Sequence, residues 1–392
     1  MKEVYTDILI IGAGPAGLGA ALEASKRDVR VLVLEKEKAL AVKPCAEAIS
    51  AATLKEIGIE ASGRLIRNRV DRVLVYAPNE RKYVEITSSM RGEGYIIDKK
   101  ELLVEMARRA VRQGAELWMM SRPVDFKVSG NIIKEVKAVR PGEEVIIKPK
   151  IVIGCDGVNS VVARKFFERK NYETIPCMQY IMLNVNVKDP HTIEIWVGRR
   201  FAPRGYLWFF PRGADEVNVG VGVRDGNPKD YLDKFIKMKQ DRFKRAAVIE
   251  VGAAPVPVGG QIDRRVKGNV MLCGDAAGQV IPLTGAGIHS SIAAGRMAGR
   301  VAANAILEEN VREEVLKAYE SEYDEYWGRR IALSLKALRA IEKLSDEELD
   351  MLAEVLSGED ILDLANGLNL VRVATKLLRH PVFAVRLAKA LL

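Results

Sequence analysis

Cysteine and histidine are scarce in this sequence, and their positions exclude two kinds of site. The four cysteines, Cys45, Cys155, Cys177 and Cys273, lie far apart and form no Cys-x-x-Cys pair. This spacing excludes a disulfide scaffold and a local thiolate zinc site, and it is typical of proteins in a reducing cytosol. Because the three histidines are equally scattered, the sequence predicts no metal site.

Long hydrophobic runs are also absent. No stretch reaches the roughly 18 consecutive apolar residues of a membrane-spanning helix, so the sequence predicts none. The apolar run near the N-terminus is short and ends in glycines, which argues against a signal peptide or a membrane anchor. We therefore expect a cytoplasmic protein, and peripheral contact with the inner face of the membrane stays open.

Glutamine is rare, with five residues in 392, and lysine, arginine and glutamate are abundant, a composition typical of thermophiles. The remaining composition is that of an ordinary globular protein, with 48% hydrophobic and 29% charged residues, which excludes wholesale disorder. The net charge of +9 permits a surface attraction to anionic lipid or nucleic acid. Such a charge is common, and we expect no nucleic-acid partner.

The first 35 residues have the pattern of a β-α-β unit. Residues 7–12 and 29–35 predict buried parallel strands, and residues 14–27 have alanine and leucine at helical spacing. The loop between them, Gly12-Ala13-Gly14-Pro15-Ala16-Gly17, matches Gly-x-Gly-x-x-Gly. In such a loop the first glycine permits a tight turn, the second lets a pyrophosphate approach, and the third allows close packing. The phosphates then lie at the positive end of the helix.

An acidic residue follows where a dinucleotide's ribose would lie. Glu35 ends the second predicted strand, about 20 residues after the glycine loop, where a carboxylate accepts hydrogen bonds from a ribose diol. Because strand, loop, helix, second strand and acid occur in the required order, the sequence predicts a dinucleotide site. These residues alone do not distinguish FAD from NAD.

Two later segments extend the pattern. Residues 272–288 combine an apolar strand, Gly274-Asp275 and a glycine-rich turn before a helix. An aspartate at a strand end can hold a polyol hydroxyl, and N–H groups of such a turn can stabilise the negative charge of a reduced isoalloxazine ring. The other segment is Gly154-Cys155-Asp156-Gly157, for which a plain turn is the alternative.

With these three motifs in order, residues 1–300 resemble the FAD-dependent oxidoreductases of the aromatic-hydroxylase type. Lys99 or Lys100 stands where that family usually has an arginine. The resemblance implies that FAD is the cofactor and that its contacts come from Gly12, Gly14, Ala16, Gly17, Glu35, Lys36, Cys45, Ala46, Ala48, Lys99, Val124, Asp275, Gly285, Gly287 and Ile288.

We expect an α/β fold in which a Rossmann-like FAD-binding domain is interrupted by an antiparallel-sheet substrate domain and followed by a helical C-terminal region. A hairpin over 69–88, an amphipathic helix over 98–114 and alternating strands over 178–225 support this order. The expected boundaries are 1–62, 95–165 and 255–302 for the FAD-binding domain, 63–94 and 166–254 for the sheet domain, and 303–392 for the helical region.

A row of aromatic residues lies in the expected sheet domain. Read as a strand, Tyr206, Trp208 and Phe210 share one face, and the following strand carries Gly220 and Gly222 on one of its faces. Glycine inside a strand often marks the close approach of a ligand, so these rows would form an apolar slot for a long hydrocarbon. An ordinary aromatic core hairpin explains the pattern equally well.

Cys45 lies in a loop after the second predicted strand, which in this fold returns across the flavin. Its thiol could touch the isoalloxazine ring, donate a proton or gate access to the flavin. Free cysteine is more often an inert buried side chain, so a packing role stays open.

Together these segments resemble the geranylgeranyl reductase family. Its signature, YxWxFP followed after seven or eight residues by GxG, is present as Tyr206, Trp208, Phe210-Pro211, Gly220 and Gly222. The family's PCGE-like loop occurs as Pro44-Cys45-Ala46-Glu47, with alanine in place of glycine. The resemblance implies substrate contacts at Tyr206, Trp208, Phe210, Gly220 and Gly222, with Cys45 as the candidate catalytic residue.

The implied reaction saturates isoprenoid C=C bonds of geranylgeranyl chains in archaeal ether lipids, by hydride transfer from N5 of the reduced flavin to an unactivated alkene. The alternatives are an FAD-dependent monooxygenase acting on an aromatic or isoprenoid substrate, and a non-catalytic flavin-binding redox protein. A single Gly-x-Gly-x-x-Gly leaves the external electron donor open between NADPH and a low-potential, ferredoxin-like partner. Basic residues at helical spacing in 370–392 suit either peripheral membrane contact or an ordinary terminal helix.

Overall fold

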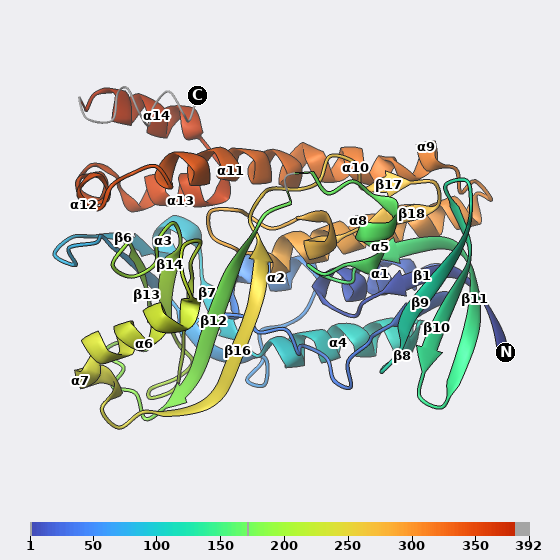
Figure 1. The fold of residues 1–392 in the computed structure, drawn as a ribbon, viewed down its shortest axis with the longest axis horizontal. Coiled ribbons are helices and arrows are strands. Elements are labelled where there is room, and N and C mark those ends of the chain that lie inside the picture. Colours follow the sequence, from blue (N-terminus) through green and yellow to red (C-terminus); the bar gives the residue numbers. More distant parts are fainter. Residues whose placement is uncertain (1, 171, 381–392) are drawn as a thin grey trace. The chain divides into compact units, whose positions relative to one another are not determined.

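The computed structural model describes residues 2–170 and 172–380, which form two compact units (Figure 1). Unit 1 comprises Met1–Val42, Lys100–Glu173 and Pro257–Ala332, and unit 2 comprises Lys43–Lys99, Thr174–Val256 and Leu333–Leu392. The mixed α/β class expected from the sequence is confirmed, because both units contain sheets and helices.

Unit 1 is built on a sheet whose eight described strands include a parallel core. The path is β17-β18-β11-β1-β2-β8, with β10 and β9 added through β11. Pairs β18–β11, β11–β1, β1–β2 and β2–β8 are parallel. The strands are β1 (Lys2–Ile11), β2 (Val31–Leu34), β8 (Glu116–Trp118), β9 (Arg122–Ser129), β10 (Ile132–Arg140), β11 (Glu143–Gly154), β17 (Val266–Lys267) and β18 (Val270–Leu272).

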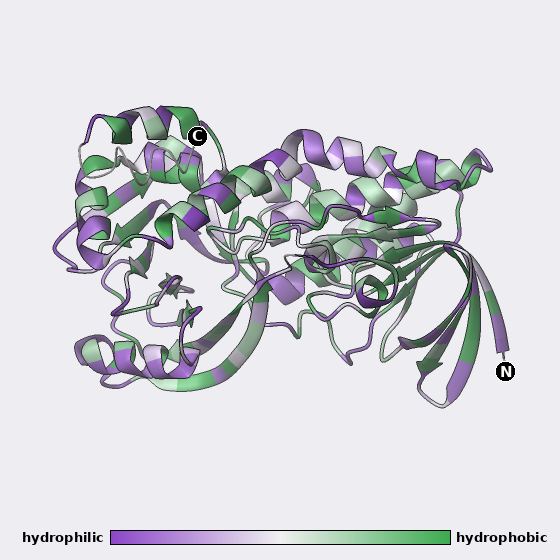
Figure 2. Cartoon of the chain, turned by 45° about the horizontal axis from the view of Figure 1, so that its top comes forward, coloured by the Kyte–Doolittle hydropathy of each residue, from purple (hydrophilic) through white to green (hydrophobic). Residues whose placement is uncertain are grey.

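Strand β1 begins earlier than the predicted residues 7–12. Its polar start pairs with the long β11, from Lys2 opposite Val145 to Ile11 opposite Gly154. Figure 2 shows this start as hydrophilic near the N label. The first residues of β1 are polar and exposed, so the hydropathy of the sequence does not predict a strand there. They form one because they pair with β11. From Thr6 onward β1 is buried, as the apolar run predicts.

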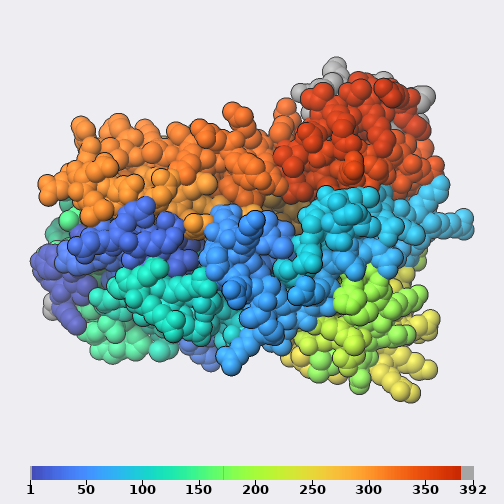
Figure 3. All heavy atoms as spheres, turned by 180° about the vertical axis from the view of Figure 1, so that it is seen from behind, coloured from blue at the N-terminus to red at the C-terminus, as the bar shows by residue number. Residues whose placement is uncertain are grey.

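The helices of unit 1 pack around this sheet. The amphipathic segment predicted over 98–114 is confirmed as α4, which lies beside residues 1–42 (Figure 3), where Ser25 Oγ and Gln113 Oε1 are 3.0 Å apart. The helices are α1 (Pro15–Ala24), α4 (Lys99–Arg112), α5 (Val161–Phe166), α8 (Ile288–Leu307), α9 (Glu313–Leu316), α10 (Ala318–Tyr323), the 3₁₀ turn η1 (Gly274–Ala277) and the π turn η2 (Asp324–Gly328).

Unit 2 contains a seven-stranded sheet of order β16-β12-β15-β14-β13-β5-β6 and a three-stranded sheet of order β3-β7-β4, counted over the described residues. The predicted hairpin and the predicted run of antiparallel strands are both confirmed in the larger sheet. The strands are β3 (Ala48–Ser50), β4 (Ile66–Val70), β5 (Arg72–Tyr76), β6 (Tyr83–Thr87), β7 (Gly94–Ile97), β12 (Thr174–Leu183), β13 (Thr192–Val197), β14 (Tyr206–Pro211), β15 (Val217–Gly222) and β16 (Ala247–Pro257).

Strand β14 separates two hydrophobic clusters of unit 2. Leu207 and Phe209 belong to the cluster that contains the valines of β15 and Phe235 of α6 (Pro228–Met238). Trp208 and Phe210 belong to another cluster, against which Tyr206 packs. The predicted alternation of faces along β14 is therefore confirmed, because neighbouring residues of a strand point to opposite sides.

The helices of unit 2 flank its sheets or follow them at the C-terminal end of the described chain. The helices are α2 (Ala51–Glu56), α3 (Ser88–Arg91), α6 (Pro228–Met238), α7 (Gln240–Phe243), α12 (Asp346–Val355), α13 (Gly358–Asn366) and α14 (Leu370–Leu378). Helix α11 (Arg329–Ile341) begins in unit 1 and ends in unit 2. The region expected as one helical part, 303–392, is thus divided between the two units at residues 332 and 333.

The compact units differ in outline from the three functional domains drawn from the sequence. Residues 43–62, expected in the FAD-binding domain, fall in unit 2, whose boundaries lie at 42/43 and 99/100 rather than 62/63 and 94/95. Among the described helices, none combines the length and the hydropathy that crossing a membrane requires.

Candidate functional site

The glycine loop between β1 and α1 uses its three glycines in different ways. A Cβ on Gly12, whose φ is +102°, would lie 2.4 Å from the Cys155 carbonyl oxygen, and a Cβ on Gly17 would lie 1.8 Å from the Gly12 oxygen. A Cβ on Gly14 would meet nothing within 4 Å. The outer glycines are therefore required by packing, whereas Gly14 borders open space.

The N-terminus of α1 offers unoccupied hydrogen-bond donors at that open space. Gly14 is the N-cap and no side chain caps the helix. The first N–H groups of a helix have no partner within it, and the helix dipole makes this end attractive to anions. Ala16 lies in this first turn, so the loop fits a pyrophosphate bound by backbone groups.

Helix α8 packs along α1 and begins about two turns before its contact with the first turn of α1. A Cβ on Gly295 would lie 1.9 Å from the Ala16 oxygen, and one on Gly299 would lie 2.3 Å from the Ala20 oxygen. From the first contact to the second, the position moves four residues forward in both helices. Helices α1 and α8 are therefore parallel, in agreement with Figure 1. Both positive helix ends therefore face the same end of unit 1.

The start of α8 has the turn that the sequence predicted. Gly285 has a φ of +67°, and Gly287 is the N-cap, which as a glycine makes no side-chain capping bond. A Cβ on Gly287 would lie 3.7 Å from Asp275 Oδ1, so the Asp275 carboxylate and this turn are neighbours. The positive end of a helix can stabilise an anionic ring edge, and a carboxylate beside it can accept a hydrogen bond from a polyol hydroxyl.

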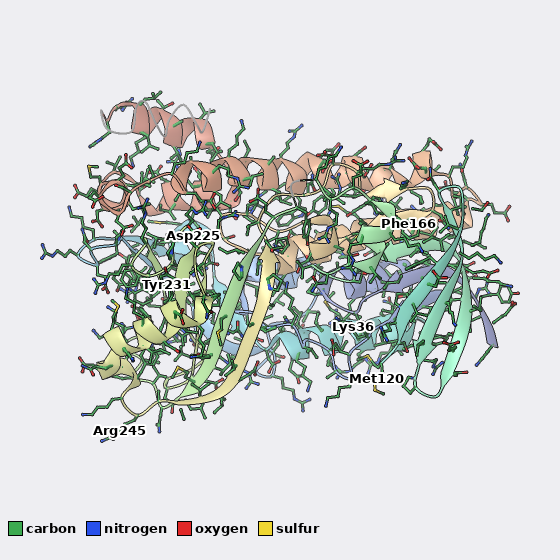
Figure 4. The ribbon with its side chains drawn as sticks, in the orientation of Figure 1. Lys36, Met120, Phe166, Asp225, Tyr231 and Arg245 are labelled. Carbon is green, nitrogen blue, oxygen red and sulfur yellow. The ribbon has the colours of Figure 1, made fainter. Side chains whose placement is uncertain are left out.

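Glu35 lies beside the glycine loop. Its Oε2 accepts a hydrogen bond from Ala13 N (2.8 Å) and its Oε1 accepts one from Glu37 N (2.9 Å). Each carboxylate oxygen can accept a further bond, so a ribose diol can still bind there. Lys36, labelled in Figure 4, has a side chain that is 67% exposed.

The other predicted cofactor contacts are distributed along unit 1 and its border. The β9–β10 register shifts at Val124, between the pairs formed by Pro123 and Asp125, which leaves the Val124 backbone outside the ladder. Lys99 is buried, and its ammonium group donates to the Lys43 carbonyl oxygen. Its contact with FAD stays a prediction.

Asp156 has a structural role. Its carboxylate accepts hydrogen bonds from Val161 N (2.7 Å) and from Ser160 Oγ (2.5 Å), and so holds the start of α5. Burial raises the pKa of Asp156, while these hydrogen bonds oppose the shift. The motif is thus a helix-start turn, the alternative left open by the sequence.

The residues of unit 1 fit FAD, because two parallel helix ends with glycine N-caps, the space at Gly14 and the carboxylates of Glu35 and Asp275 occur in one unit. Within residues 2–170 and 172–380, no group of three or more His, Cys, Asp or Glu side chains could hold a metal ion.

In unit 2, the aromatic row and the glycine row lie directly opposite each other. Tyr206 pairs with Gly222, Trp208 with Gly220 and Phe210 with Asn218. We call Tyr206, Trp208 and Phe210 the aromatic wall. A Cβ on Gly220 would lie 2.3 Å from Trp208 Cζ2, so the indole ring covers Gly220 and fills the slot at this point. Gly220 is required because the ring lies flat over its strand.

The position of Gly222 differs from that of Gly220. A Cβ there would lie 3.0 Å from Cys177 Sγ and 3.6 Å from Ile175 Cδ1. Burial raises the pKa of the Cys177 thiol to about 12, so this thiol is neutral at physiological pH. Burial also raises the pKa of Tyr206, with smaller contributions from Cys177 and Cys45. The Cys177 thiol and the Tyr206 hydroxyl are therefore both neutral at this end of the wall.

The segment 43–48, which we call the Cys45 loop, packs against the wall. Ala46 contacts the hydrophobic cluster of Trp208 and Phe210. Cys45 is half-buried, and its Sγ accepts a hydrogen bond from Glu47 N (3.3 Å). The exposed Ala48 begins β3. The structure thus brings Cys45, Ala46 and the aromatic wall together within unit 2.

Three polar residues of this site were not singled out as functional from the sequence. Arg212 pairs with the Glu47 carboxylate, and Asn218 donates from Nδ2 to the Cys45 carbonyl oxygen (3.0 Å). Burial raises the pKa of Glu47, against the opposing effect of Arg212. For Asn218 the sequence did contain a signal, because it is the one polar residue in the apolar strand VNVGVG. Of that face, only the glycines were used to predict the slot.

Two known families match different parts of the chain. The family described as geranylgeranyl reductase catalytic domain matches residues 173–256, and the family described as FAD dependent oxidoreductase matches residues 7–165. The first range contains the aromatic wall, and the second contains the glycine loop.

Relatives of known name align over nearly the whole chain. A digeranylgeranylglycerophospholipid reductase 2 from Methanopyrus kandleri is 35% identical, covering 98% of this chain and 99% of the relative. A digeranylgeranylglycerophospholipid reductase from Methanocaldococcus jannaschii is 34% identical, covering 100% and 99%. A geranylgeranyl bacteriochlorophyll reductase-like protein from Thermoplasma acidophilum has a similar structure, with a TM-score of 0.89, 26% identity and full coverage of both chains.

Proposed function

The chain belongs to the digeranylgeranylglycerophospholipid reductase family, and from this premise we propose that it is an FAD-dependent reductase that saturates C=C bonds of geranylgeranyl chains in archaeal ether lipids. The observation that carries this proposal is the agreement over the full length of relatives bearing that name. The matched catalytic region contains the aromatic wall, in which Trp208 and Phe210 are buried and Tyr206 is the partly exposed ring that an isoprenoid chain can contact.

FAD, when bound and reduced, supplies the hydride for the alkene. The chain's own residues then have three tasks. The backbone donors of α1 and α8 hold the anionic parts of the cofactor. The aromatic wall holds the lipid chain and excludes water. The faces of Tyr206 and Trp208 stabilise positive charge that develops on an alkene without a neighbouring carbonyl.

Cys45 is the candidate for delivering the proton to the second alkene carbon. Its support is its place in a loop that packs on the aromatic wall, with its thiol held by Glu47 N. The test is Cys45→Ser and Cys45→Ala. We expect slower alkene reduction at normal FAD content, with a smaller loss for serine. Unchanged rates in both variants would remove Cys45 from the chemistry.

The function itself is tested without oxygen. The purified protein is reduced with dithionite, given a digeranylgeranylglyceryl phospholipid, and the lipid mass is followed. We expect stepwise gains of two hydrogens per double bond. No gain with bound, reduced flavin would contradict the proposal. In a separate assay in air, oxygen consumption coupled to product would indicate a monooxygenase instead.

The external electron donor in this proposal is NADPH or a ferredoxin-like protein. The net charge of +9 favours an acidic protein donor. Anaerobic bleaching of the flavin by each donor distinguishes them, and reduction by the protein donor should slow as salt rises.

Peripheral contact with an anionic membrane is the remaining part of the proposal, and its support lies in β16. This edge strand exposes Val248, Ile249 and Val251 by 46%, 57% and 59%, directly after the exposed Lys244 and Arg245. Figure 4 shows Arg245 extending away from the ribbon. Apolar side chains beside cationic ones suit a lipid surface of negative charge.

The predicted basic tail gives less support. In its described part, Lys376 pairs with Asp360 (2.5 Å) and Arg372 with Asp363 (2.6 Å), both on α13. Residues 381–392 lie outside the described residues. Flotation with anionic liposomes should therefore be lost in the double variant Ile249→Glu and Val251→Glu, but retained in Val371→Glu on α14. Retained flotation of the double variant would exclude β16.

A further inference from the structure

A single buried amide connects the aromatic wall to the Cys45 loop. Asn218 lies in β15 and is fully buried. Its Oδ1 accepts a hydrogen bond from Trp208 Nε1 (2.8 Å), and its Nδ2 donates to the Cys45 carbonyl oxygen (3.0 Å). The amide oxygen of Asn218 therefore binds the aromatic wall, and its amide nitrogen binds the Cys45 loop.

The chemistry of the two partners fixes the orientation of this amide. An indole N–H can only donate and a carbonyl oxygen can only accept, so the oxygen of Asn218 must face Trp208 and the nitrogen must face Cys45. Burial of an amide without partners is unfavourable, which holds the side chain in the bonded position.

The first of these bonds sets the position of the indole ring. Trp208 lies over Gly220, where a Cβ would be 2.3 Å from Cζ2 and 2.6 Å from Cε2. A flat surface without a side chain does not by itself fix the rotation of the ring upon it. The bond from Nε1 to Asn218 supplies that constraint.

The second bond acts on a loop that is also held at both of its ends. At the near end, the Lys99 ammonium group donates to the Lys43 carbonyl oxygen. Glu47 has a φ of +65°, its carboxylate accepts from Lys99 N (3.1 Å) and pairs with Arg212, and its carbonyl oxygen accepts from Ile97 N (3.0 Å). These contacts fix Glu47. The Cys45 carbonyl, two residues earlier, is fixed by Asn218.

We propose that Asn218 is a positioning residue that couples the indole of Trp208 to the backbone of Cys45. A lipid chain that shifts the ring then shifts the Cys45 loop as well, and a displaced loop changes the wall. A role of this coupling in lipid reduction rests on the proposed function, whereas the coupling itself does not. The contacts themselves lie wholly within unit 2.

The test measures the reactivity of Cys45 in the free protein. The rate of alkylation by iodoacetamide is followed for the Cys45 and Cys177 peptides by mass spectrometry. Trp208→Phe keeps a ring but removes the Nε1 donor. Asn218→Asp keeps the acceptor for Trp208 but places an oxygen against the Cys45 carbonyl.

We expect Trp208→Phe to change the Cys45 alkylation rate about threefold or more, and Asn218→Asp to raise it about fivefold or more, as loss of one buried hydrogen bond permits. In an Asn218→Leu background, Trp208→Phe should have no further effect, because the connection is already broken. Cys177, which packs against the same cluster as Trp208, reports any general loosening of that cluster. Equal effects of Trp208→Phe in both backgrounds would overturn the proposal.

Asn269→Asp is the matched control. Asn269 is a buried amide of unit 1 that accepts from Ile133 N (2.8 Å) and donates to the Lys150 oxygen (2.9 Å). Its substitution should lower the melting temperature as Asn218→Asp does, but leave the Cys45 rate unchanged. A raised Cys45 rate in this control would show general loosening and overturn the assignment.

Lipid turnover separates this proposal from the proposed function. If the wild type reduces the lipid, Asn218→Asp should lower kcat about tenfold while KM changes less than about threefold, since the aromatic wall remains. A loss confined to KM would overturn the positioning role. If the wild type reduces no lipid while the alkylation coupling holds, the proposed function fails and the coupling stands.

Discussion

The two compact units offer their binding groups in different chemical forms. Unit 1 presents backbone N–H groups at the ends of α1 and α8, and its glycines allow these helices to approach each other and the β1 loop. Unit 2 presents side chains on β14 and β15, and holds them with the buried groups Asn218 and Arg212. A binding site formed by backbone N–H groups depends on glycines, because a Cβ would block the approach to those groups. A site made of side chains depends on what each one contacts.

The largest effect should come from filling the space that unit 1 keeps clear. Gly17→Ala places a Cβ 1.8 Å from the Gly12 oxygen, and we expect the unfolding free energy to fall by about 3 kcal/mol, with loss of FAD. Chemical denaturation and flavin absorbance measure both.

Gly14→Ala is the matched variant, because its Cβ meets nothing within 4 Å. It should fold normally yet bind FAD about tenfold more weakly, which corresponds to about 1.4 kcal/mol. Unchanged FAD affinity would mean that the open space at Gly14 is not where the cofactor approaches the backbone.

A second test fills the corresponding position in unit 2. Gly222→Leu drives a side chain into Cys177 and Ile175 beside the wall. We expect lipid turnover to fall at least about a hundredfold, or about 2.7 kcal/mol in the barrier, with FAD content unchanged. If turnover stays normal, the lipid chain does not use this end of the wall. If FAD is lost as well, FAD binding by unit 1 depends on the packing of unit 2.

The contacts of Glu47 give a smaller effect. Glu47→Gln keeps the shape but removes the charge that Arg212 faces, while Arg212 retains Glu216 (2.6 Å). We expect a loss of about 2 kcal/mol in unfolding free energy, because a buried cation keeps only one partner. Glu216→Gln is the control and should cost less, since Glu216 is more exposed than Glu47. The reverse order would place the main anchor at Glu216.

An effect of similar size, which depends on pH, concerns a charge of unit 1 away from the site. Burial raises the pKa of Asp7, but hydrogen bonds from Lys150 and Arg30 outweigh it and lower the pKa to about 2. A lowered folded pKa stabilises the protein above the ordinary value near 3.8, and this contribution is lost as pH falls toward 2. Asp7→Asn should therefore cost about 2 kcal/mol at pH 7 and almost nothing at pH 2. Equal costs at both values would rule out the charge as the cause.

The nucleotide-binding loop of unit 1 was largely predictable, because the spacing of its glycines can be read directly from the sequence. Gly12, Gly14 and Gly17 identified the loop, and Glu35 followed at the distance that a β-α-β unit requires. The parallel pairing of α1 and α8 was not predictable, since Gly295 and Gly299 acquire their meaning only when Ala16 and Ala20 lie against them.

In unit 2 the sequence determined less. It placed Tyr206, Trp208 and Phe210 on one face, because a strand alternates its side chains with a period of two. It did not show that the Trp208 ring covers Gly220, nor that Asn218 bridges Trp208 and Cys45, which are separated from it by 10 and 173 positions. The sequence by itself thus determined the elements whose signal is local, namely glycine turns, strand alternation and the amphipathic helix α4. Only the tertiary structure decided which buried polar groups pair, because a hydrogen bond depends on distance in space and leaves no period along the chain.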